Sequence, residues 1–440
     1  MILNFPDFII SMLQKLSSHG FQAYLVGGCV RDVVLGMKPH DYDIATNAKP
    51  DEIINVFGLE NCSAYGRAFG TVGVYYNNNF AEITTYRTET DYTDYRHPNQ
   101  VYFANDILED LARRDFTCNA MAWHPETGLL DIYHGKEDLE NNILRCVGVP
   151  SARFREDALR ILRGMRFASR LQLKPEIITH SAMIAGAFRL KYISAERIFS
   201  ELCNMLMGDN ITEILLTYPE ILAVWIPEIY PCIAFSQHSK HHDFTVWEHI
   251  ARAVGNAPKN LTVRMTMLFH DIAKPACYQV DSKGGHFKTH AQKSAVLANN
   301  ILLRLKSDNY LRKQVCRLIA LHRNIPNTLP EVRKLIGNIG YEEFDLFLQV
   351  LESDRISKLI HQPESNIKIK KLAELAEICK SQNLCCCIKD LEIDGNDLLK
   401  LGFHGKQIKY ILNFILDTVI SENCLNEKQV LLSFVKENYL

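Results

Sequence analysis

The chain has 440 residues, of which 47% are hydrophobic and 23% charged, the composition of a globular protein with room for two or more domains. Its formal net charge of −2 excludes a basic surface spread over the whole molecule, so a nucleic-acid partner would have to meet local stripes of Lys and Arg. The 13 cysteines lack paired C-x-x-C spacing, and neither a basic leader nor a long apolar run occurs, so we expect a cytoplasmic protein without disulfides or a membrane span.

Hydrophobic spacing divides the chain into a head that mixes helices with strands and a body built from helices. In about the first 135 residues, residues 7–19 show helical spacing, and the runs FQAYLVGG, DYDIAT, TVGVYY, FAEITTYR and GLLDIYHG have the composition of strands. From Ser151 onward such runs nearly vanish, and apolar residues recur at spacings of three and four. The sequence therefore predicts an α+β fold, with a small mixed β-sheet and helices at the N-terminus and an all-α body after it.

The stretch YLVGGCVRD, residues 24–32, has two glycines directly after a short apolar run. Gly27 and Gly28 would let the backbone approach a ligand closely where a strand ends and a helix begins. The N–H groups at a helix N-terminus favour phosphate, and Arg31 would add charge-assisted hydrogen bonds to it. An isolated pair of glycines would equally suit a plain strand-to-helix turn.

Two aspartates one residue apart follow in HDYDIAT. Because residues i and i+2 of a strand point to the same face, the carboxylates of Asp41 and Asp43 converge on one point. Such a pair holds divalent cations such as Mg²⁺, which activate an attacking hydroxyl and stabilise a leaving pyrophosphate. Glu82, in the middle of the predicted strand FAEITTYR, is a weaker third ligand, and an exposed edge position explains it as well. The whole pattern indicates a nucleotidyltransferase head, with Asp41 and Asp43 as catalytic residues.

A third motif, LEDLARRDFTCNAMAW, follows at residues 108–123. Together with LVGGCVRD and HDYDIAT it resembles the bacterial-type (class II) tRNA nucleotidyltransferases, the CCA-adding enzymes, and their relatives the bacterial poly(A) polymerases. The resemblance implies that Arg114 binds the triphosphate with Gly28 and Arg31, and that Asp115 and Asn119 shape the ribose site. Arg113 would be either a phosphate ligand or a surface charge.

The run REDALRILRGMRFASRL places Asp157 and Arg160 three residues apart, hence on one face of a predicted helix. Cytosine and adenine both present an amino donor beside a ring-nitrogen acceptor, so a fixed Asp and a fixed Arg would accept C and A. Guanine and uracil would meet clashing donors. The resemblance implies the same roles, with Arg163 and Arg166 assisting and Arg170 beyond them. The alternative is a solvated basic helix face.

The segment TETDYTDYRHPN, residues 88–99, lacks regular apolar spacing and reads as a loop. The resemblance implies that a flexible loop in this region helps the pocket switch from C to A. We therefore expect an enzyme that adds CCA or A, and not one that adds C alone.

The body carries a separate set of residues in TVWEHI, LFHDIAKP and VLESDRIS. His249, His270, Asp271 and Asp354, all on predicted helices, resemble the HD-domain phosphohydrolases in their order. Imidazoles and carboxylates suit a divalent metal that activates water against a phosphoester, so we expect a second metal site here. His290 would be a further ligand or a helix-surface histidine.

We expect four domains: residues 1–140 as the nucleotidyltransferase head or palm, 141–225 as a base-selecting neck, 226–362 as an HD-type helical domain, and 363–440 as a helical tail. In the tail, short helices punctuated by glycine would bring their N-termini and three lysines to tRNA phosphates. A helical cap on the body is the alternative. The lysines are Lys400, Lys406 and Lys409.

These motifs favour a CCA-adding tRNA nucleotidyltransferase that uses Mg²⁺ to join nucleotides from CTP and ATP to the tRNA 3′-hydroxyl, with an HD-domain phosphohydrolase activity beside it. The rivals are a poly(A) polymerase and an A-adding or CC-adding enzyme. From another class comes an HD-type RNA-repair phosphohydrolase whose head only binds RNA. The near-neutral charge counts against a polymerase of long RNA, which is held largely through its phosphates.

Overall fold

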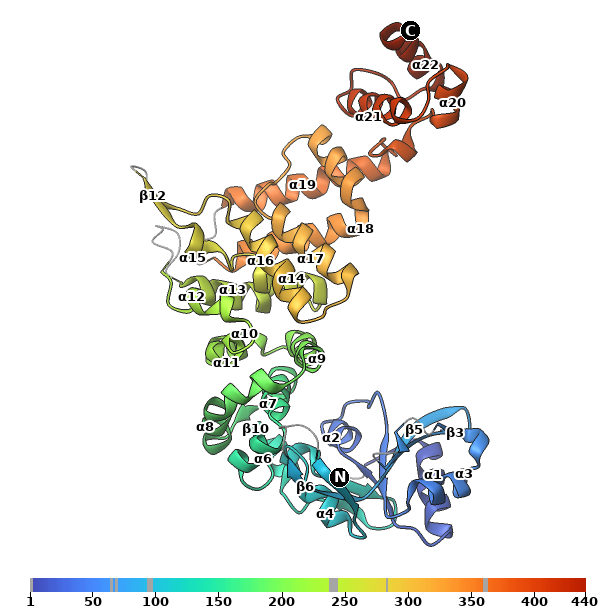
Figure 1. The fold of residues 1–440 in the computed structure, drawn as a ribbon, viewed down its shortest axis with the longest axis vertical. Helices are drawn as coiled ribbons and strands as arrows, with labels where there is room; N and C mark the ends of the chain where they lie inside the picture. Colours follow the sequence, from blue (N-terminus) through green and yellow to red (C-terminus); the bar gives the residue numbers. More distant parts are fainter. Residues whose placement is uncertain are drawn as a thin grey trace. The chain divides into compact units, whose positions relative to one another are not determined.

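The computed structural model of the protein describes residues 3–63, 66–67, 70–92, 98–236, 244–281, 284–358 and 363–440. The chain folds as two compact units, Met1–Pro227 and Glu228–Leu440, which run from blue to green and from yellow-green to red in Figure 1. The finer division into four domains stays a prediction.

The first unit is built on a mixed seven-stranded sheet of order β3-β4-β5-β2-β1-β8-β9. Its neighbouring strands are antiparallel, except that β2 runs parallel to β5. The predicted α+β class, with a mixed sheet at the N-terminus and helices after it, is confirmed. The strands are β1 (Ala23–Val26), β2 (Asp43–Thr46), β3 (Cys62–Ser63), β4 (Thr71–Tyr76), β5 (Asn79–Thr85), β8 (Ala122–His124) and β9 (Gly128–Leu130).

Buried apolar faces of its strands and of the neighbouring helices stabilise this sheet. In β5, Ala81, Ile83 and Thr85 are buried while the residues between them are more exposed, the alternation of a strand with one face on the core. Helix α1 (Asp7–Ser18) buries four residues at helical spacing, and helix α3 (Pro50–Phe57) begins with a proline at its first position. Each buried Leu, Ile or Met stabilises the unit by roughly 1.5–3 kcal/mol. The α1 residues are Ile9, Met12, Leu13 and Leu16.

The segment expected to be a loop is largely a two-stranded ribbon. β6 (Arg87–Tyr92) pairs antiparallel with β7 (Pro98–Phe103), and residues 93–97 lie outside the described residues. The loop prediction for 88–92 and 98–99 is wrong because it relied on the missing apolar alternation. Thr and Tyr favour strands even where neither face of the strand is apolar.

Helices complete the first unit. One of them, α7 (Leu159–Leu171), packs against α9 (Ala195–Leu206) and carries the arginine stripe. The others are α2 (Gly28–Val34), α4 (Ile107–Ala112), α5 (Gly135–Glu140), α6 (Pro150–Glu156), α8 (Ile177–Gly186), α10 (Ile211–Thr217) and α11 (Pro219–Ala223).

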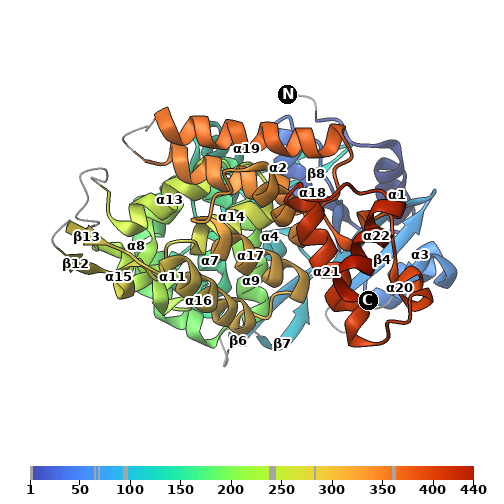
Figure 2. The ribbon, with the colours of Figure 1, turned by 90° about the horizontal axis from the view of Figure 1, so that it is seen from above.

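In its described residues, the second unit is helical apart from one short hairpin. Its central helix α14 (Leu261–Phe269) is buried from Val263 to Phe269 and contacts helices α13, α17 and α18. Figures 1 and 2 show α18 and α19 side by side. The elements are α12 (Tyr230–Ile233), α13 (Val246–Asn256), α15 (Lys274–Cys277), β12 (Gln279–Asp281), β13 (Gly284–His286), α16 (His290–Arg304), α17 (Asn309–Leu321), α18 (Leu329–Ile356), α19 (Pro363–Ser381), α20 (Gly395–Lys400), α21 (Lys406–Ile420) and α22 (Lys428–Tyr439).

Two further features concern helix length and the cysteines. Among the described residues, no helix combines the length and the apolar character that a membrane crossing requires. All thirteen cysteines lie in the described ranges and are free thiols.

Candidate functional site

Three carboxylates lie near enough to influence one another's charge where β2 begins. Asp43, the first residue of β2, is paired in register with Glu82 of the parallel strand β5, which places their side chains on the same face of the sheet. Asp41 precedes the strand in a bend, so the prediction that it lies on a strand is wrong. Asp41 lies outside the strand because the pairing of β2 with β5 begins only at Asp43. Nearby, Pro39 also lacks the backbone N–H that a longer strand would use.

The electrostatics of this edge favour a cation. Burial, followed by the charges of Asp41 and Glu82, raises the pKa of Asp43 to about 6, against an opposing effect of Arg114. Carboxylate oxygens are the ligands that hard divalent cations prefer, so these residue types fit the expected metal.

A cavity of about 920 Å³ opens beside Asp41 and Asp43. Nine arginines and one lysine line it against five aspartates, a strong local positive excess in a chain whose net charge is −2. Such a surface suits a polyanion. It is the kind of local basic patch that we expected a nucleic-acid partner to need, since the chain as a whole is nearly neutral. Its cationic lining residues are Arg31, Lys38, Arg87, Arg113, Arg114, Arg160, Arg163, Arg166, Arg170 and Arg197.

The absence of a side chain at Gly27 leaves room for the Arg114 side chain at the wall of this cavity. Gly27 has a φ of 74°, and a Cβ there would lie 2.7 Å from Nη1 of Arg114. Arg114 donates to the carbonyl oxygen of Asn119 at 3.2 Å and to Oδ2 of Asp110 at 3.0 Å. Gly28 starts α2 beside the cavity, as predicted. A side chain at Gly27 would push Arg114 out of its place.

A hydrogen-bonded chain fixes the other predicted groups. Arg31 donates to Oδ1 of Asn119 at 2.7 Å, and Asn119 donates to Oδ1 of Asp115 at 3.1 Å. Arg163 donates to Oδ2 of Asp115 at 2.7 Å. Burial opposes the charge of Asp115, but Arg163 and the hydrogen bonds outweigh it and lower its pKa to about 2. Asp115 therefore stays ionised and holds the arginines in position.

The candidate base-selecting pair lies at a break between two helices. Asp157 ends α6 with φ −135° and ψ 106°, and its Oδ1 accepts from the backbone N–H of Leu159 at 2.9 Å at the start of α7. The prediction that Asp157 and Arg160 share one face of a single helix is therefore wrong, because the carboxylate competes with the helix for backbone donors. Both side chains nevertheless line the same cavity.

Two residues that the sequence reasoning missed hold this pair. Arg160 donates to Oε2 of Glu156 at 2.6 Å and to the carbonyl oxygen of Arg113 at 3.0 Å. Arg197, from α9, donates to Oδ2 of Asp157 at 2.9 Å. Glu156 stands inside the motif and could have been noticed, whereas nothing in the sequence links Arg197 to a residue forty positions earlier.

The arginine stripe of α7 continues along the cavity as predicted. Arg166 lies 2.7 Å from Oε2 of Glu201, a residue of α9, and its guanidinium carbon is 4.3 Å from the centre of the Phe167 ring. Arg163 also lies over Phe167, at 5.4 Å. The aromatic face and the acid hold the stripe toward the cavity, so a freely solvated basic face does not describe it.

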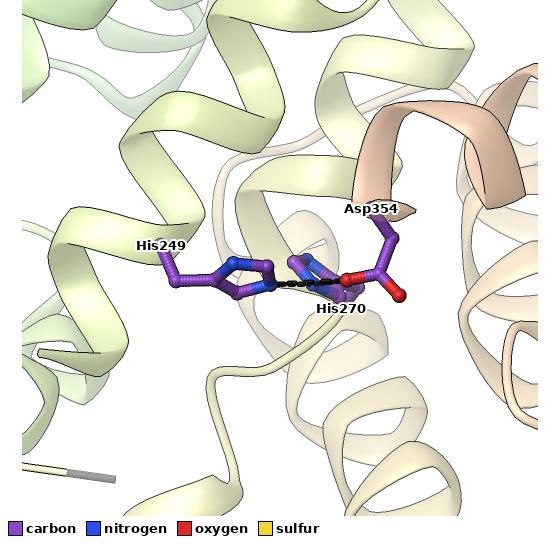
Figure 3. A group of neighbouring side chains, drawn as sticks. All are labelled: His249, His270 and Asp354. Atoms are coloured by element: carbon purple, nitrogen blue, oxygen red, sulfur yellow. Dashed lines mark hydrogen bonds and ion pairs between the residues drawn. The ribbon is translucent and has the colours of Figure 1, made fainter. Parts of the chain in front are cut away.

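A second cluster forms in the second unit, where the structure brings together all four residues predicted for the second metal site. Nε2 of His249, on α13, lies 3.2 Å from Nε2 of His270 and 3.1 Å from Oδ1 of Asp354, on α18 (Figure 3). Nε2 of His249 is also 3.4 Å from Oδ2 of Asp271. His270 and Asp271 lie in the turn directly after α14. The prediction that they lie on a helix is therefore wrong.

Two more histidines complete this cluster. His290, the first residue of α16, is buried with its Nε2 3.2 Å from Oδ1 of Asp271, so it does not lie on the helix surface. Nε2 of His322, which the sequence reasoning missed, is 3.8 Å from the same oxygen. The signal for it was a histidine directly after an apolar helix, in LIALH, just as His270 follows α14 in MLFH.

The cluster stabilises a positive charge on His270 and disfavours a second one on His322. Burial alone would keep His270 neutral, yet Asp271 and Asp354 raise its pKa to about 9. Burial, followed by the charge of His270, lowers the pKa of His322 to about 3. Burial works against the Asp271 carboxylate, but His270 and Lys274 hold its pKa well below the ordinary range. A set of imidazoles and carboxylates that favours a cation fits a divalent metal ion.

Two family models match the chain. The first is described as the poly A polymerase head domain and matches residues 23–145, which include β1, β2 and the RRD motif. The second is described as a putative tRNA nucleotidyltransferase domain 2 and matches residues 287–435.

Proteins named CCA-adding enzyme are similar to the chain in sequence. One from Staphylococcus epidermidis is 30% identical over 436 residues, 96% of each chain. One from Lactococcus lactis subsp. cremoris is 50% identical over 202 residues, which are 45% of this chain and 50% of that protein.

Solved structures show the same fold. The Bacillus stearothermophilus CCA-adding enzyme in complex with CTP has a TM-score of 0.72 and 25% identity, covering 98% of this chain and 96% of that one. The Thermotoga maritima CCA-adding enzyme complexed with tRNA has a TM-score of 0.60 and 18% identity, covering 99% and 96%.

Proposed function

The chain belongs to the family of CCA-adding enzymes, and from this premise we propose that it is a class II, bacterial-type member that also carries an HD domain. It adds C, C and A to the 3′ end of tRNA from CTP and ATP, without a nucleic-acid template, and releases pyrophosphate. The observation that carries the proposal for the reaction site is the arginine-lined cavity with Asp41 and Asp43 at its edge.

In the head, Asp41, Asp43 and, more weakly, Glu82 would hold Mg²⁺. When bound there, a divalent ion would neutralise developing charge and would lower the pKa of the attacking hydroxyl. Arg31 and Arg114 bind the triphosphate beside the backbone of Gly28, and Asp115 keeps Arg163 aimed into the cavity. The protein thereby brings triphosphate and tRNA end together with fixed positive charge.

Asp157 and Arg160 choose the base. The Asp157 carboxylate accepts from the exocyclic amino group of C or A, and Arg160 donates to the adjacent ring nitrogen. G and U reverse the donor and acceptor at these positions and leave buried groups without partners, which costs them binding. Arg163 and Arg166 assist by neutralising the phosphates on the same wall.

We propose two further assignments for the rest of the chain. The tail helices α20 and α21, with Lys400, Lys406 and Lys409, contact tRNA phosphates. The protein works in the cytoplasm, where a reducing environment keeps its thirteen free thiols unpaired.

The second cluster supports a second activity. His249, His270, Asp271 and Asp354 would hold a divalent metal that activates water against a phosphomonoester or a 2′,3′-cyclic phosphate. The observation favouring it is that four residues from three segments of the second unit converge, with His270, Asp271 and Asp354 each within 3.4 Å of Nε2 of His249. Lys358, 2.7 Å from Oδ2 of Asp354, would attract the substrate phosphate.

The test uses purified protein with tRNA that lacks CCA, tRNA that ends in CC, and each nucleoside triphosphate singly. We expect C incorporation on the first tRNA, A incorporation on the second, and no incorporation of G or U. A long A tract on either tRNA would indicate a poly(A) polymerase. Phosphohydrolysis without nucleotide incorporation would indicate the RNA-repair alternative.

A further inference from the structure

We infer that Lys38 and Arg170, which line the head cavity, bind phosphates of the RNA strand whose 3′ end is extended. Lys38 lies in the loop between α2 and β2, and Arg170 lies in the last turn of α7. The inference rests on the nucleotide addition proposed above and deepens it. It separates the residues that hold the RNA from those that hold the nucleoside triphosphate.

Ion pairs divide the ten cationic residues of this cavity into two groups. Seven arginines each lie within 3.0 Å of a carboxylate oxygen. Arg87 also interacts with another residue. Within the ranges that the structure describes, Lys38 and Arg170 form neither an ion pair nor a hydrogen bond through their side chains. The seven paired residues are Arg31, Arg113, Arg114, Arg160, Arg163, Arg166 and Arg197.

The paired arginines are fixed in position before any ligand arrives. The side chains of Arg31, Arg114 and Arg160 are only 12%, 18% and 10% exposed. Each carboxylate partner offsets part of the positive charge and sets the direction of the guanidinium group. Groups held in this way suit a compact ligand that must lie in one place, which describes the triphosphate and the base of the incoming nucleotide.

Lys38 and Arg170 have the opposite character. Both side chains are exposed, so water and counterions alone compensate their charge among the described residues. A phosphate that binds them releases those counterions, and no existing ion pair has to break. A tRNA is far too large to enter the cavity whole, so its phosphates reach cations that remain exposed to solvent. The two residues therefore suit the RNA backbone.

The positions of the two residues agree with this role. Lys38 precedes Asp41 by three residues, at the edge proposed to hold Mg²⁺. Arg170 extends the stripe of Arg163 and Arg166, because spacings of three and four residues keep all three on one face of α7. The 3′-hydroxyl has to reach the Asp41 edge, so the last phosphates of the strand have to lie along the walls of this same cavity.

The test is the kinetics of C addition to tRNA lacking CCA. Lys38→Gln or Arg170→Gln removes one charge and should raise KM for tRNA by roughly 3- to 10-fold, while kcat and KM for CTP change little. Arg170→Lys keeps the charge and should restore most of the affinity for tRNA. Lys174→Gln is the matched control, because this exposed lysine of β11 (Lys174–Pro175) does not line the cavity. It should behave as wild type.

A binding measurement separates a lost phosphate contact from a general defect. Fluorescence anisotropy gives Kd for the same tRNA without nucleotide, at about 50 to 200 mM KCl. Each Gln variant should reduce the slope of log Kd against log [KCl] by roughly 0.7–0.9, the value for one lost phosphate contact. Thermal melts should match wild type, because both side chains are exposed and make no ion pair within the described residues.

The outcomes distinguish this inference from the proposed function. A raised KM for CTP with an unchanged salt slope for tRNA would assign the two cations to the triphosphate and overturn the inference. Unchanged KM values and slopes in both Gln variants would overturn it as well. Absence of C incorporation by wild type would contradict nucleotide addition itself, and the salt slopes would still decide whether Lys38 and Arg170 bind RNA.

Discussion

The two units each place acidic side chains at a proposed site for divalent cations, but the neighbouring groups shift the pKa values of these acids in opposite directions. In the head, like charges crowd together and the pKa of Asp43 rises to about 6. In the second unit, histidines and Lys274 surround Asp271 and hold its pKa well below the ordinary range, although it is even more deeply buried. The same residue type is therefore tuned by its neighbours and not by burial alone.

The two proposed sites also differ in their ligand atoms and in how exposed they are to solvent. The head offers oxygen ligands at the edge of a cavity of about 920 Å³, lined by arginines, as a triphosphate and an RNA end require. The second unit offers imidazole nitrogens in a buried cluster that is partly exposed at Asp354. The two proposed sites therefore differ in the ions that their ligands favour, because oxygen ligands suit Mg²⁺ and imidazole nitrogens suit transition metals.

The largest expected effect is the loss of nucleotide incorporation when a carboxylate of the head site is removed. Asp41→Ala or Asp43→Ala should lower nucleotide incorporation by roughly 10³-fold or more. Each variant removes a carboxylate ligand of the metal ion that would stabilise the charge developing in the transition state. Single-turnover addition of C to tRNA lacking CCA measures this. Asp51→Ala, on the exposed first turn of α3, is the matched control and should behave as wild type. Incorporation within a few-fold of wild type in either variant would remove the catalytic assignment.

A smaller effect is expected at the base-selecting pair. Asp157→Ala or Arg160→Ala should relax selection against UTP and GTP by roughly 1–3 kcal/mol, about 5- to 150-fold, because each loses one hydrogen-bond partner of the base. The ratio of kcat/KM between CTP and UTP measures selection. Arg155→Ala, an exposed neighbour in α6, serves as the control. Strict selection for CTP and ATP in both variants would place base recognition elsewhere.

The smallest effect concerns stability in the absence of metal. A carboxyl whose pKa is raised in the folded state contributes most stability at low pH, and this contribution is lost as pH rises from about 4 through about 6. Asp43→Asn should therefore raise Tm by about 2–4 °C at pH 8 in EDTA, and the gain should vanish near pH 4. Thermal melts at the two pH values test this. An equal gain at both would mean that charge repulsion at Asp43 is not the cause.

The sequence predicted those parts of each site that are contiguous in the chain or keep a regular spacing. Asp41, Asp43, Arg114 and the stripe through Arg166 all line one cavity because short motifs record local geometry. The break at Asp157 escaped notice, since helical spacing of apolar residues continues across it.

Two of the missed residues come from distant elements. Arg197 reaches Asp157 because α9 packs against α7, and His322 reaches Asp271 because α17 packs against α14. Such contacts between distant elements depend on packing, which a single sequence does not record as spacing.

The most direct measurement is a crossed assay of both reactions on three proteins: wild type, Asp43→Ala and His270→Ala. It scores addition of CCA to tRNA and Mn²⁺-dependent hydrolysis of a 2′,3′-cyclic phosphate, with circular dichroism to confirm folding. We predict that Asp43→Ala loses only CCA addition and that His270→Ala loses only hydrolysis. Loss of CCA addition in a folded His270→Ala protein, or the absence of hydrolysis in wild type, would contradict the separation of the two sites.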